Sequence, residues 1–312
     1  GDLYAQDGYE SPVWGRYSWN GDVIWEMELP IHHEILLTPD DTIITLTKEA
    51  KEYNGRTVEF DVILELDKSG NILRRWSTWD NLKQLQQYHG RLELDRPPNA
   101  ILPENHKKNT SIWGAEHDYY HMNAVSLVPP NSKQGTHAAF DPGNWIISFR
   151  HGSMVFIIDD ETGDVLWRAI YDQVEDNLEG PHAPKMLPNG NILIYDNGRY
   201  REWTRLVEID PVTLDVVWEY RSEDFFSYSQ GYVQLLPNGN MLVTESEEGR
   251  VFELTRDEQI VWEWWRPEML DDPDEKNYGK RHDIYRMVRY DVVWEYRSED
   301  FFSYSQIGRA HV

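Results

Sequence analysis

Histidines recur just ahead of predicted strands in this sequence. They stand in the stretches IHHEILL (His32 and His33), HDYYHMNAVSL (His117 and His121) and EGPHAPKML (His182). A neutral imidazole is a competent nucleophile for a sulfuryl or phosphoryl centre, and it divides one displacement into two. The transition state of such a transfer carries negative charge, which cations and hydrogen-bond donors stabilise. These segments therefore suggest group transfer to a histidine nitrogen.

Arg150 and Asn123 are the predicted partners of this chemistry. Arg150 ends the predicted strand GNWIISFR. Asn123 follows His121 by two residues, so the side chains of His121 and Asn123 share a strand face. A cation and an amide donor near the histidines would stabilise the developing charge. The alternative for Arg150 is an ion pair with one of many surface carboxylates.

Other chemistries of clustered imidazoles have less support. Histidine is a common ligand of zinc and copper, but the sequence has no HxH or HExxH motif, and the acids adjacent to these histidines are Glu34 and Asp118. The G-x-S-x-G motif of serine hydrolases is also absent. We therefore predict no metal and no other cofactor.

The elements that would position these residues form a repeat. A turn followed by a hydrophobic residue, a variable residue and Trp recurs roughly every 45 to 50 residues, with one longer step. The copies are GDVIWEMEL from Gly21, GNILRRWS from Gly70 (with Arg74 in place of Trp), GDVLWRAI from Gly163, LDVVWEYR from Leu214 and EQIVWEWW from Glu258.

Two further hairpins complete each repeat. One precedes the Trp unit, as in KMLPNGNILIYD and QLLPNGNMLVTE, and the other follows that hairpin, as in TRLVEIDPVT. Four strands per repeat of this length are typical of a β-propeller blade, whose innermost strands line a central channel. Histidines that occupy the same position in different blades, at the start of the innermost strand, are therefore expected to meet at the mouth of this channel.

The propeller is predicted to occupy residues 1–290. The longer step contains a polar, proline-bearing stretch with helical spacing at Leu82 and Leu85, and we predict that residues 79–118 are an inserted loop and helix over one face. The pair Tyr119 and Tyr120, with Trp113, predicts an aromatic entrance suited to phenols; the alternative is that these rings pack blades together.

Residues 291–312 do not fit the repeat. DVVWEYRSEDFFSYSQ occurs at 215–230 and again without change at 291–306, although all other repeat pairs have diverged. The last six residues, IGRAHV, match a translated sequencing adapter. We expect this tail to be an assembly artefact, and the natural chain to continue differently after Tyr290.

The composition of the chain disfavours some classes of binding partner. The chain of 312 residues has 55 Asp and Glu against 30 Lys and Arg, a formal charge of −25, which disfavours nucleic acid and anionic membranes. It has no Cys and no apolar run long enough for a membrane span. It opens at Gly1 without a recognisable leader, and the oligomeric state is left open.

The ordered motifs resemble the bacterial arylsulfotransferase family, which moves a sulfuryl group from an aryl sulfate to another phenol. The matching segments are HHEILLTPDDTIITL, HDYYHMNAVSL, NWIISFRHGSMVFIID, EGPHAPKMLPNGNILIYDNG, LLPNGNMLVTESEEGRVFEL and IYRMVRY, within roughly residues 20–290. The resemblance implies an all-β, six-bladed propeller and a PAPS-independent ping-pong reaction, and it leaves open whether this chain is truncated. Its partners would be a small aryl sulfate and a phenol, and its location periplasmic or extracellular.

The resemblance also implies roles for individual residues. His182 would be the transiently sulfated nucleophile, and the catalytic set would include His121, Arg150 and His33. The substrate-binding residues would be Asn123, His32, Thr244 and Tyr119, and the sequence does not decide whether His32 or His33 faces the channel.

The sequence departs from the family pattern in places. Pro181 stands where the family has Gln, and the loop between His121 and Arg150 is longer. Four complete blades can be counted, plus a composite one from the N-terminal VWGRYSWNGDVIWEMEL and the C-terminal IYRMVRY, so a sixth is unaccounted for.

Two other functions fit a propeller. IIDDETGDVLW, residues 157–167, resembles the Trp-docking repeat of quinone-dependent dehydrogenases, but it is well formed once only. A propeller that binds a ligand or protein without catalysis is the second alternative.

Overall fold

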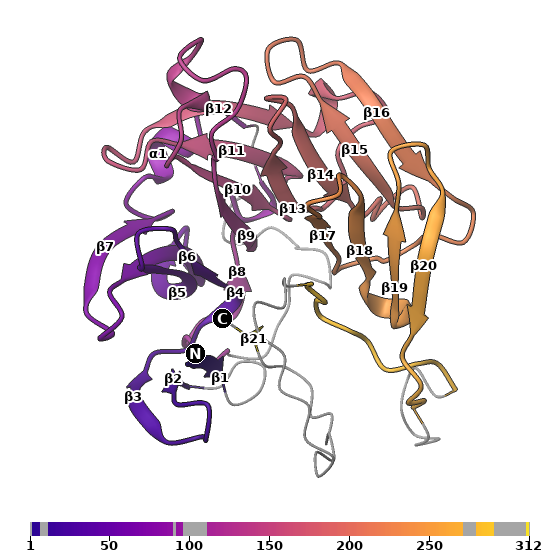
Figure 1. Ribbon diagram of the computed structural model, residues 1–312. Helices are drawn as coiled ribbons and strands as arrows, with labels where there is room; N and C mark the ends of the chain where they lie inside the picture. The colour runs from indigo at the N-terminus through magenta and orange to yellow at the C-terminus, as the bar shows by residue number, and fades with distance from the viewer. Residues whose placement is uncertain are drawn as a thin grey trace.

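Apolar residues in alternation, interrupted by tight turns, form antiparallel sheets along most of the chain. The computed structural model describes residues 2–6, 12–89, 92–95, 111–270, 279–289 and 310–311. These contain five sheets, which follow one another around a common centre as the blades of a β-propeller (Figure 1). The predicted all-β propeller with four-stranded blades is confirmed.

Strands run from the centre of the ring outward in each blade (Figure 1). The first blade is β21 (Ala310–His311), β1 (Leu3–Gln6), β2 (Val13–Tyr17) and β3 (Val23–Glu28). The second is β4 (His32–Leu37), β5 (Ile43–Tyr53), β6 (Arg56–Leu66) and β7 (Ile72–Ser77), with the short β8 (His117–Asp118) parallel to β6. The third is β9 (Met122–Leu127), β10 (Trp145–Phe149), β11 (Met154–Ile158) and β12 (Val165–Ile170). The fourth is β13 (Pro181–Met186), β14 (Ile192–Asp196), β15 (Arg205–Ile209) and β16 (Val216–Arg221), and the fifth is β17 (Tyr232–Leu235), β18 (Met241–Glu245), β19 (Arg250–Leu254) and β20 (Ile260–Trp265).

The described residues form five blades, so the expected number of six is wrong. That number came from the family pattern, whereas the sequence itself contains five repeat units. The composite first blade also differs from its prediction, because β21 is its innermost strand and residues 284–289 form no strand. The artefactual origin of 291–312 stays a prediction, since 290–309 and 312 lie outside the described residues.

The predicted excursion lies against the second and third blades where it is described. Its α-helix, α1 (Leu82–Leu85), is where the sequence predicted a helical turn. Leu85 is buried among side chains of both blades, and Gln84 accepts a hydrogen bond from the backbone of Val165. A 3-10 turn, Glu93–Asp95, follows α1, and others lie at Ala138–Phe140, Tyr171–Gln173 and Ser246–Glu248. Residues 90–91 and 96–110 of the excursion lie outside the described part of the chain.

Repeated hydrogen bonds join the outer strands of the first four blades to the next blade. The side chain at the Trp position of the repeat donates to a backbone carbonyl in the neighbouring β-turn. The pairs are Trp25 to Lys68 at 2.9 Å, Arg74 to Asp160 at 2.6 Å, Trp167 to Pro211 at 2.7 Å and Trp218 to Arg256 at 3.1 Å. Arg74 thus forms the same kind of contact as Trp at this position of the repeat. The fifth copy, Trp262, is 40% exposed, and no carbonyl of the described residues accepts from it.

Residues 284–289 form an extended segment, called the strap below, that joins the fifth blade to the second. On the fifth blade, the backbone of Met287 donates to Thr244, and Arg289 exchanges two hydrogen bonds with Gln234. On the second blade, Arg286 pairs with Glu34. These contacts connect positions 252 residues apart in the sequence.

Candidate active site

Inner strands of three neighbouring blades share an irregularity near the centre of the ring. His33, His121 and Ala183 have φ angles of 59°, 54° and 46°. This left-handed conformation is unfavourable for residues other than glycine. Register shifts accompany it in β4 and β13. A bulge redirects the side chains beside it, and the side chains in these places are the histidines singled out by the sequence.

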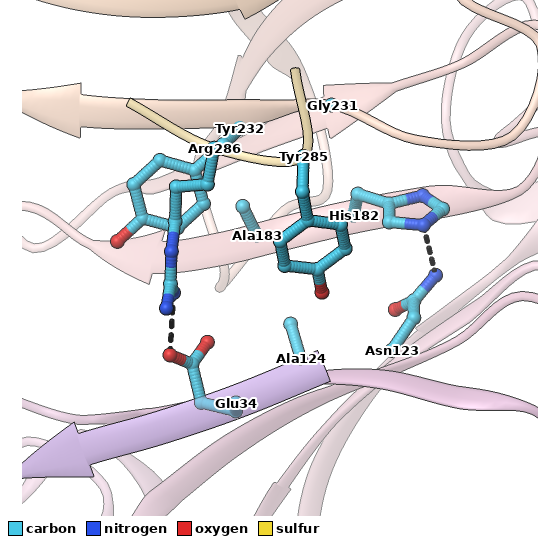
Figure 2. A pocket seen from close by; sticks show the side chains of 9 residues that line it. All are labelled: Glu34, Asn123, Ala124, His182, Ala183, Gly231, Tyr232, Tyr285 and Arg286. Atoms are coloured by element: carbon cyan, nitrogen blue, oxygen red, sulfur yellow. Dashed lines mark hydrogen bonds and ion pairs between the residues drawn. The ribbon is translucent and has the colours of Figure 1, made fainter. Parts of the chain in front are cut away.

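Two hydrogen bonds fix the tautomer of His182. Its Nδ1 lies 3.0 Å from the carbonyl oxygen of Gly180, which only accepts, so Nδ1 carries the hydrogen. Its Nε2 lies 2.9 Å from the amide nitrogen of Asn123, which donates to it (Figure 2). Burial disfavours the imidazolium and lowers the pKa of His182 to about 4. His182 is therefore a neutral imidazole at neutral pH, with its basic nitrogen facing Asn123.

The amide of Asn123 is held by three contacts. The hydroxyl of Ser148 donates to its oxygen, which assigns the amide nitrogen as the donor on the other side. That nitrogen donates both to His182 and to the carbonyl oxygen of Pro181, at 3.0 Å. Asn123 is 4% exposed, so its orientation toward His182 is fixed by the interior.

Asp118 orients His121 in the same manner. His121 Nδ1 lies 2.6 Å from the Asp118 carboxylate, so Nδ1 donates and Nε2 carries the lone pair. Lys48 lies 2.6 Å from Asp118 and 2.8 Å from Glu59. Burial opposes the charge of Asp118, but Lys48 and then His121 more than compensate and hold the pKa of Asp118 well below its usual range. His121 thus has an anionic partner that is itself anchored.

A relay of hydrogen bonds fixes His33. The carbonyl oxygen of Thr47 accepts from His32 Nε2 at 3.2 Å, so His32 Nδ1 is an acceptor. His33 Nδ1 lies 2.7 Å from His32 Nδ1, so His33 Nδ1 must donate to it. His33, His121 and His182 therefore all carry hydrogen on Nδ1 and a lone pair on Nε2.

Histidines of three blades meet at this place. The rings of His33 and His121 pack edge to face with centroids 5.2 Å apart. Burial, and then the proximity of His32, His121 and His182, lower the pKa of His33 well below its usual value. His33 and His121 are thus in ring contact, and His182 is near enough to influence the charge of His33.

Arg150 lies beside this cluster without a carboxylate partner. Its Nε is buried and unbonded, and among the described residues its side chain forms no ion pair. The Arg150 guanidinium lies 5.8 Å from the centre of the Tyr228 ring, and that of Arg199 lies 5.4 Å from the same ring. Burial and then Arg199 lower the pKa of Arg150. In a chain with net charge −25, two neighbouring arginines that form no ion pair with the described residues favour an anionic ligand.

A small cavity of about 10 Å³ adjoins His182. The Tyr285 ring lies between the Arg286–Glu34 pair and the His182–Asn123 pair, and its hydroxyl points into this space (Figure 2). The lining residues are Glu34, Asn123, Ala124, His182, Ala183, Gly231, Tyr232, Tyr285 and Arg286. The volume is about that of one water molecule, so the strap fills most of the site.

A larger hollow of about 550 Å³ lies by the fifth blade, but its lining makes it a poor anion site. Five carboxylates and a single arginine surround it: Glu223, Asp224, Glu245, Glu248 and Glu263, with Arg250. Carboxylates repel an anionic substrate, so the histidine cluster is the better candidate.

Three predicted substrate-binding residues lie elsewhere. Thr244 accepts the backbone hydrogen bond of Met287 and anchors the strap. Tyr119 is 1% exposed and donates to Asp95 at 2.6 Å, so it packs the blades instead of lining an entrance. His32 is buried behind His33, which answers the open choice between the two: His33 is the member that contacts His121.

Several residues of the site were not predicted. Asp118, three residues before His121, was detectable from the D-x-x-H spacing, because a carboxylate is the usual orienting partner of an imidazole. Arg199, after the DNG turn, was detectable by analogy with Arg150, since both follow a second strand. Lys48 and Tyr285 had no such signal, because their contacts depend on how separate blades pack.

The described residues contain no group of three or more His, Asp or Glu placed to hold a metal ion. None of their helices is long and apolar enough to cross a membrane.

The chain was compared with protein families, curated proteins and solved structures. The chain is similar in structure to a protein of unknown function from Bacteroides caccae, with 14% identity, a TM-score of 0.45 and coverage of 86% of this chain and 74% of that one. It is similar to an inactive virginiamycin B lyase from Staphylococcus aureus solved with quinupristin, with 12% identity, a TM-score of 0.44 and coverage of 86% and 71%. A search of the curated proteins found no match. The family Arylsulfotransferase (ASST) matches residues 14–266, most of the chain. The chain belongs to the arylsulfotransferase family.

Proposed function

We propose that this protein transfers a sulfuryl group from an aryl sulfate to a phenol through a sulfated histidine, His182. The observation that carries the proposal is the state of His182: a buried, neutral imidazole whose hydrogen is fixed on Nδ1 by Gly180. Nε2 is thereby the nucleophilic nitrogen. Its lone pair accepts from the Asn123 amide in this structure, so that hydrogen bond has to break when Nε2 attacks the sulfur. Family membership supports the reaction class, and the geometry supports the residue.

In the first step His182 Nε2 attacks the sulfur of the donor. The N–S bond forms, the S–O bond to the aryl group breaks, and the phenolate leaves with the electron pair. Negative charge on the sulfuryl oxygens would be stabilised by Arg150, whose Nε is buried and unbonded and whose side chain forms no ion pair among the described residues, and by the Asn123 amide.

In the second step a phenol oxygen attacks the sulfur on His182. The N–S bond breaks, the S–O bond forms, and the phenol proton must go to a base. The Nε2 lone pair of His121 is the best candidate, since Asp118 on the opposite nitrogen stabilises the imidazolium that results.

A transfer assay tests this proposal. With 4-nitrophenyl sulfate as the donor, we expect nitrophenolate release that depends on added phenol in the wild type. In the variant His182→Ala the rate of this release should fall at least about a thousandfold, because the covalent route is removed. Release that persists in a folded His182→Ala protein would exclude His182 as the nucleophile. No release from the folded wild type would favour a propeller that binds without catalysis.

A further inference from the structure

The cavity beside His182 already contains a phenol, the side chain of Tyr285. Tyr285 and His182 line the same small space, and the Tyr285 ring lies between His182 and the Arg286–Glu34 pair (Figure 2). A phenol is also the chemical class of the acceptor in the proposed reaction. The chain therefore places a group of acceptor chemistry where an external acceptor would have to bind.

The position of Tyr285 is defined from both sides. Its hydroxyl donates to the carbonyl oxygen of His33 at 3.0 Å, and its ring packs edge to face on the His33 ring with centroids 6.1 Å apart. The next residue, Arg286, pairs with Glu34 and stacks on Tyr232 at 4.9 Å. The hydroxyl donates through its hydrogen, so its oxygen keeps lone pairs for attack on an electrophile.

The Tyr285 ring can also leave the cavity beside His182. The side chain is 45% exposed. With a cavity of about 10 Å³, no aryl sulfate fits while the ring is in place. A donor must therefore displace the ring, and the ring is free to return once the phenolate product has left.

We propose that Tyr285 is an internal sulfuryl acceptor, modified by the enzyme on its phenol oxygen when no external phenol competes. This inference rests on the proposed function. The N–S bond on His182 breaks and an S–O bond to Tyr285 forms; the phenol proton passes to a neighbouring imidazole, and His182 returns to its neutral state. The donor aryl sulfate supplies the sulfuryl group, and no oxidant or other reactant is required.

Tyr232 provides a matched control. It is a second phenol that lines the same cavity, but its hydroxyl accepts from Lys185 at 3.2 Å and its ring is covered by Arg286. Its hydroxyl points away from His182 (Figure 2). The inference therefore predicts modification of Tyr285 and not of Tyr232.

The experiment treats the full chain with 4-nitrophenyl sulfate in the absence of phenol, for the wild type and for Tyr285→Phe, Tyr232→Phe and His182→Ala. The rapid release of nitrophenolate and the mass of tryptic peptides are measured. We expect the mass gain of one SO₃ group on peptide 282–286. The burst should be about two equivalents in the wild type and in Tyr232→Phe, about one in Tyr285→Phe and none in His182→Ala.

The outcomes separate the two proposals. Normal transfer to added phenol, with equal bursts in the wild type and Tyr285→Phe and no mass gain on 282–286, would overturn the internal acceptor and leave the sulfotransferase intact. Mass gain on the peptide of Tyr232 would overturn it also. Absence of nitrophenolate release with and without phenol would overturn both. Folding of Tyr285→Phe is checked by its transfer to added phenol.

Discussion

Single atoms decide the reactivity of the histidine cluster. The carbonyl oxygen of Gly180, the carboxylate of Asp118 and the ring of His32 each occupy the Nδ1 side of one imidazole. This leaves Nε2 as the basic nitrogen in every case. Selection of one tautomer by a fixed partner removes the need to reorganise protons before the reaction.

The first prediction concerns the pH dependence of His182. Because burial lowers its pKa to about 4, the neutral nucleophile is fully present above that pH and is lost by protonation as the pH falls through about 4. The rate of the nitrophenolate burst should therefore be nearly constant from about pH 7 to pH 5. Stopped-flow measurements with circular dichroism as a folding control test this. An acidic limb near pH 6.5, the value of an exposed imidazole, would contradict it.

The second prediction concerns Asp118. In Asp118→Asn an amide oxygen still accepts from His121 Nδ1, but the negative charge that stabilises a protonated His121 is gone. We expect transfer to phenol to slow about ten- to a hundredfold, with the first burst much less affected because His182 performs that step. An equal loss in both steps would indicate a general disturbance of the fold, since Lys48 also contacts Asp118.

The strap shows how an element without regular structure completes a site made by strands. Three inner strands supply the histidines and Asn123, and the strap contributes Tyr285 and Arg286 from far along the sequence. Its own backbone groups bond to the fifth blade, so it is fixed although it has no strand partner.

The third prediction tests the strap through its ion pair. Glu34 is 8% exposed, so Arg286→Met leaves a nearly buried carboxylate without its partner and should cost about 2 kcal/mol. The double variant Glu34→Gln with Arg286→Met should cost less than the two single variants combined. Urea unfolding measures the free energies, and hydrogen exchange at 284–289 should accelerate in each single variant. Strictly additive losses would show that the pair is not coupled.

Sequence patterns predicted the parts of the site that lie within one repeat. The phase of the histidines, the position of Arg150 at the end of a strand and the helical turn at Leu82 all follow from local spacing. The failures concern contacts between blades. Tyr119 was assigned to the entrance because its ring type suits phenols, but Asp95 satisfies its hydroxyl in the interior. Tyr285 was missed because only closure of the ring brings it to His33.

At the scale of the whole ring, the carbonyl contacts between blades set the spacing of the sheets. The repeat unit predicted by the sequence places Trp or Arg at the edge of each blade, and the turn of the next blade receives it. The contact itself serves any ring size, so the number of blades follows from the count of repeat units, which is five, and not from the geometry of one unit.

The fourth prediction compares two of these tryptophans. Trp167→Phe removes the hydrogen bond to Pro211 and should lower the free energy of unfolding by about 1 to 2 kcal/mol. Trp262→Phe removes an indole that no described carbonyl accepts from, so its cost should be below about 0.5 kcal/mol beyond lost packing. Urea unfolding at neutral pH gives both values. Equal costs would mean that the carbonyl contact contributes nothing.

The contacts of Arg286 and Tyr285 with the second blade also set the timing of maturation. Glu34 leaves the ribosome long before Arg286, 252 residues later in the chain, a delay of roughly 10 to 50 s at ordinary rates of translation. During that interval the second to fourth blades can assemble the histidine cluster, while the side of the cavity formed by the strap is still being synthesised. A nascent chain would thus acquire the proposed nucleophile, His182, first and the proposed internal acceptor, Tyr285, last.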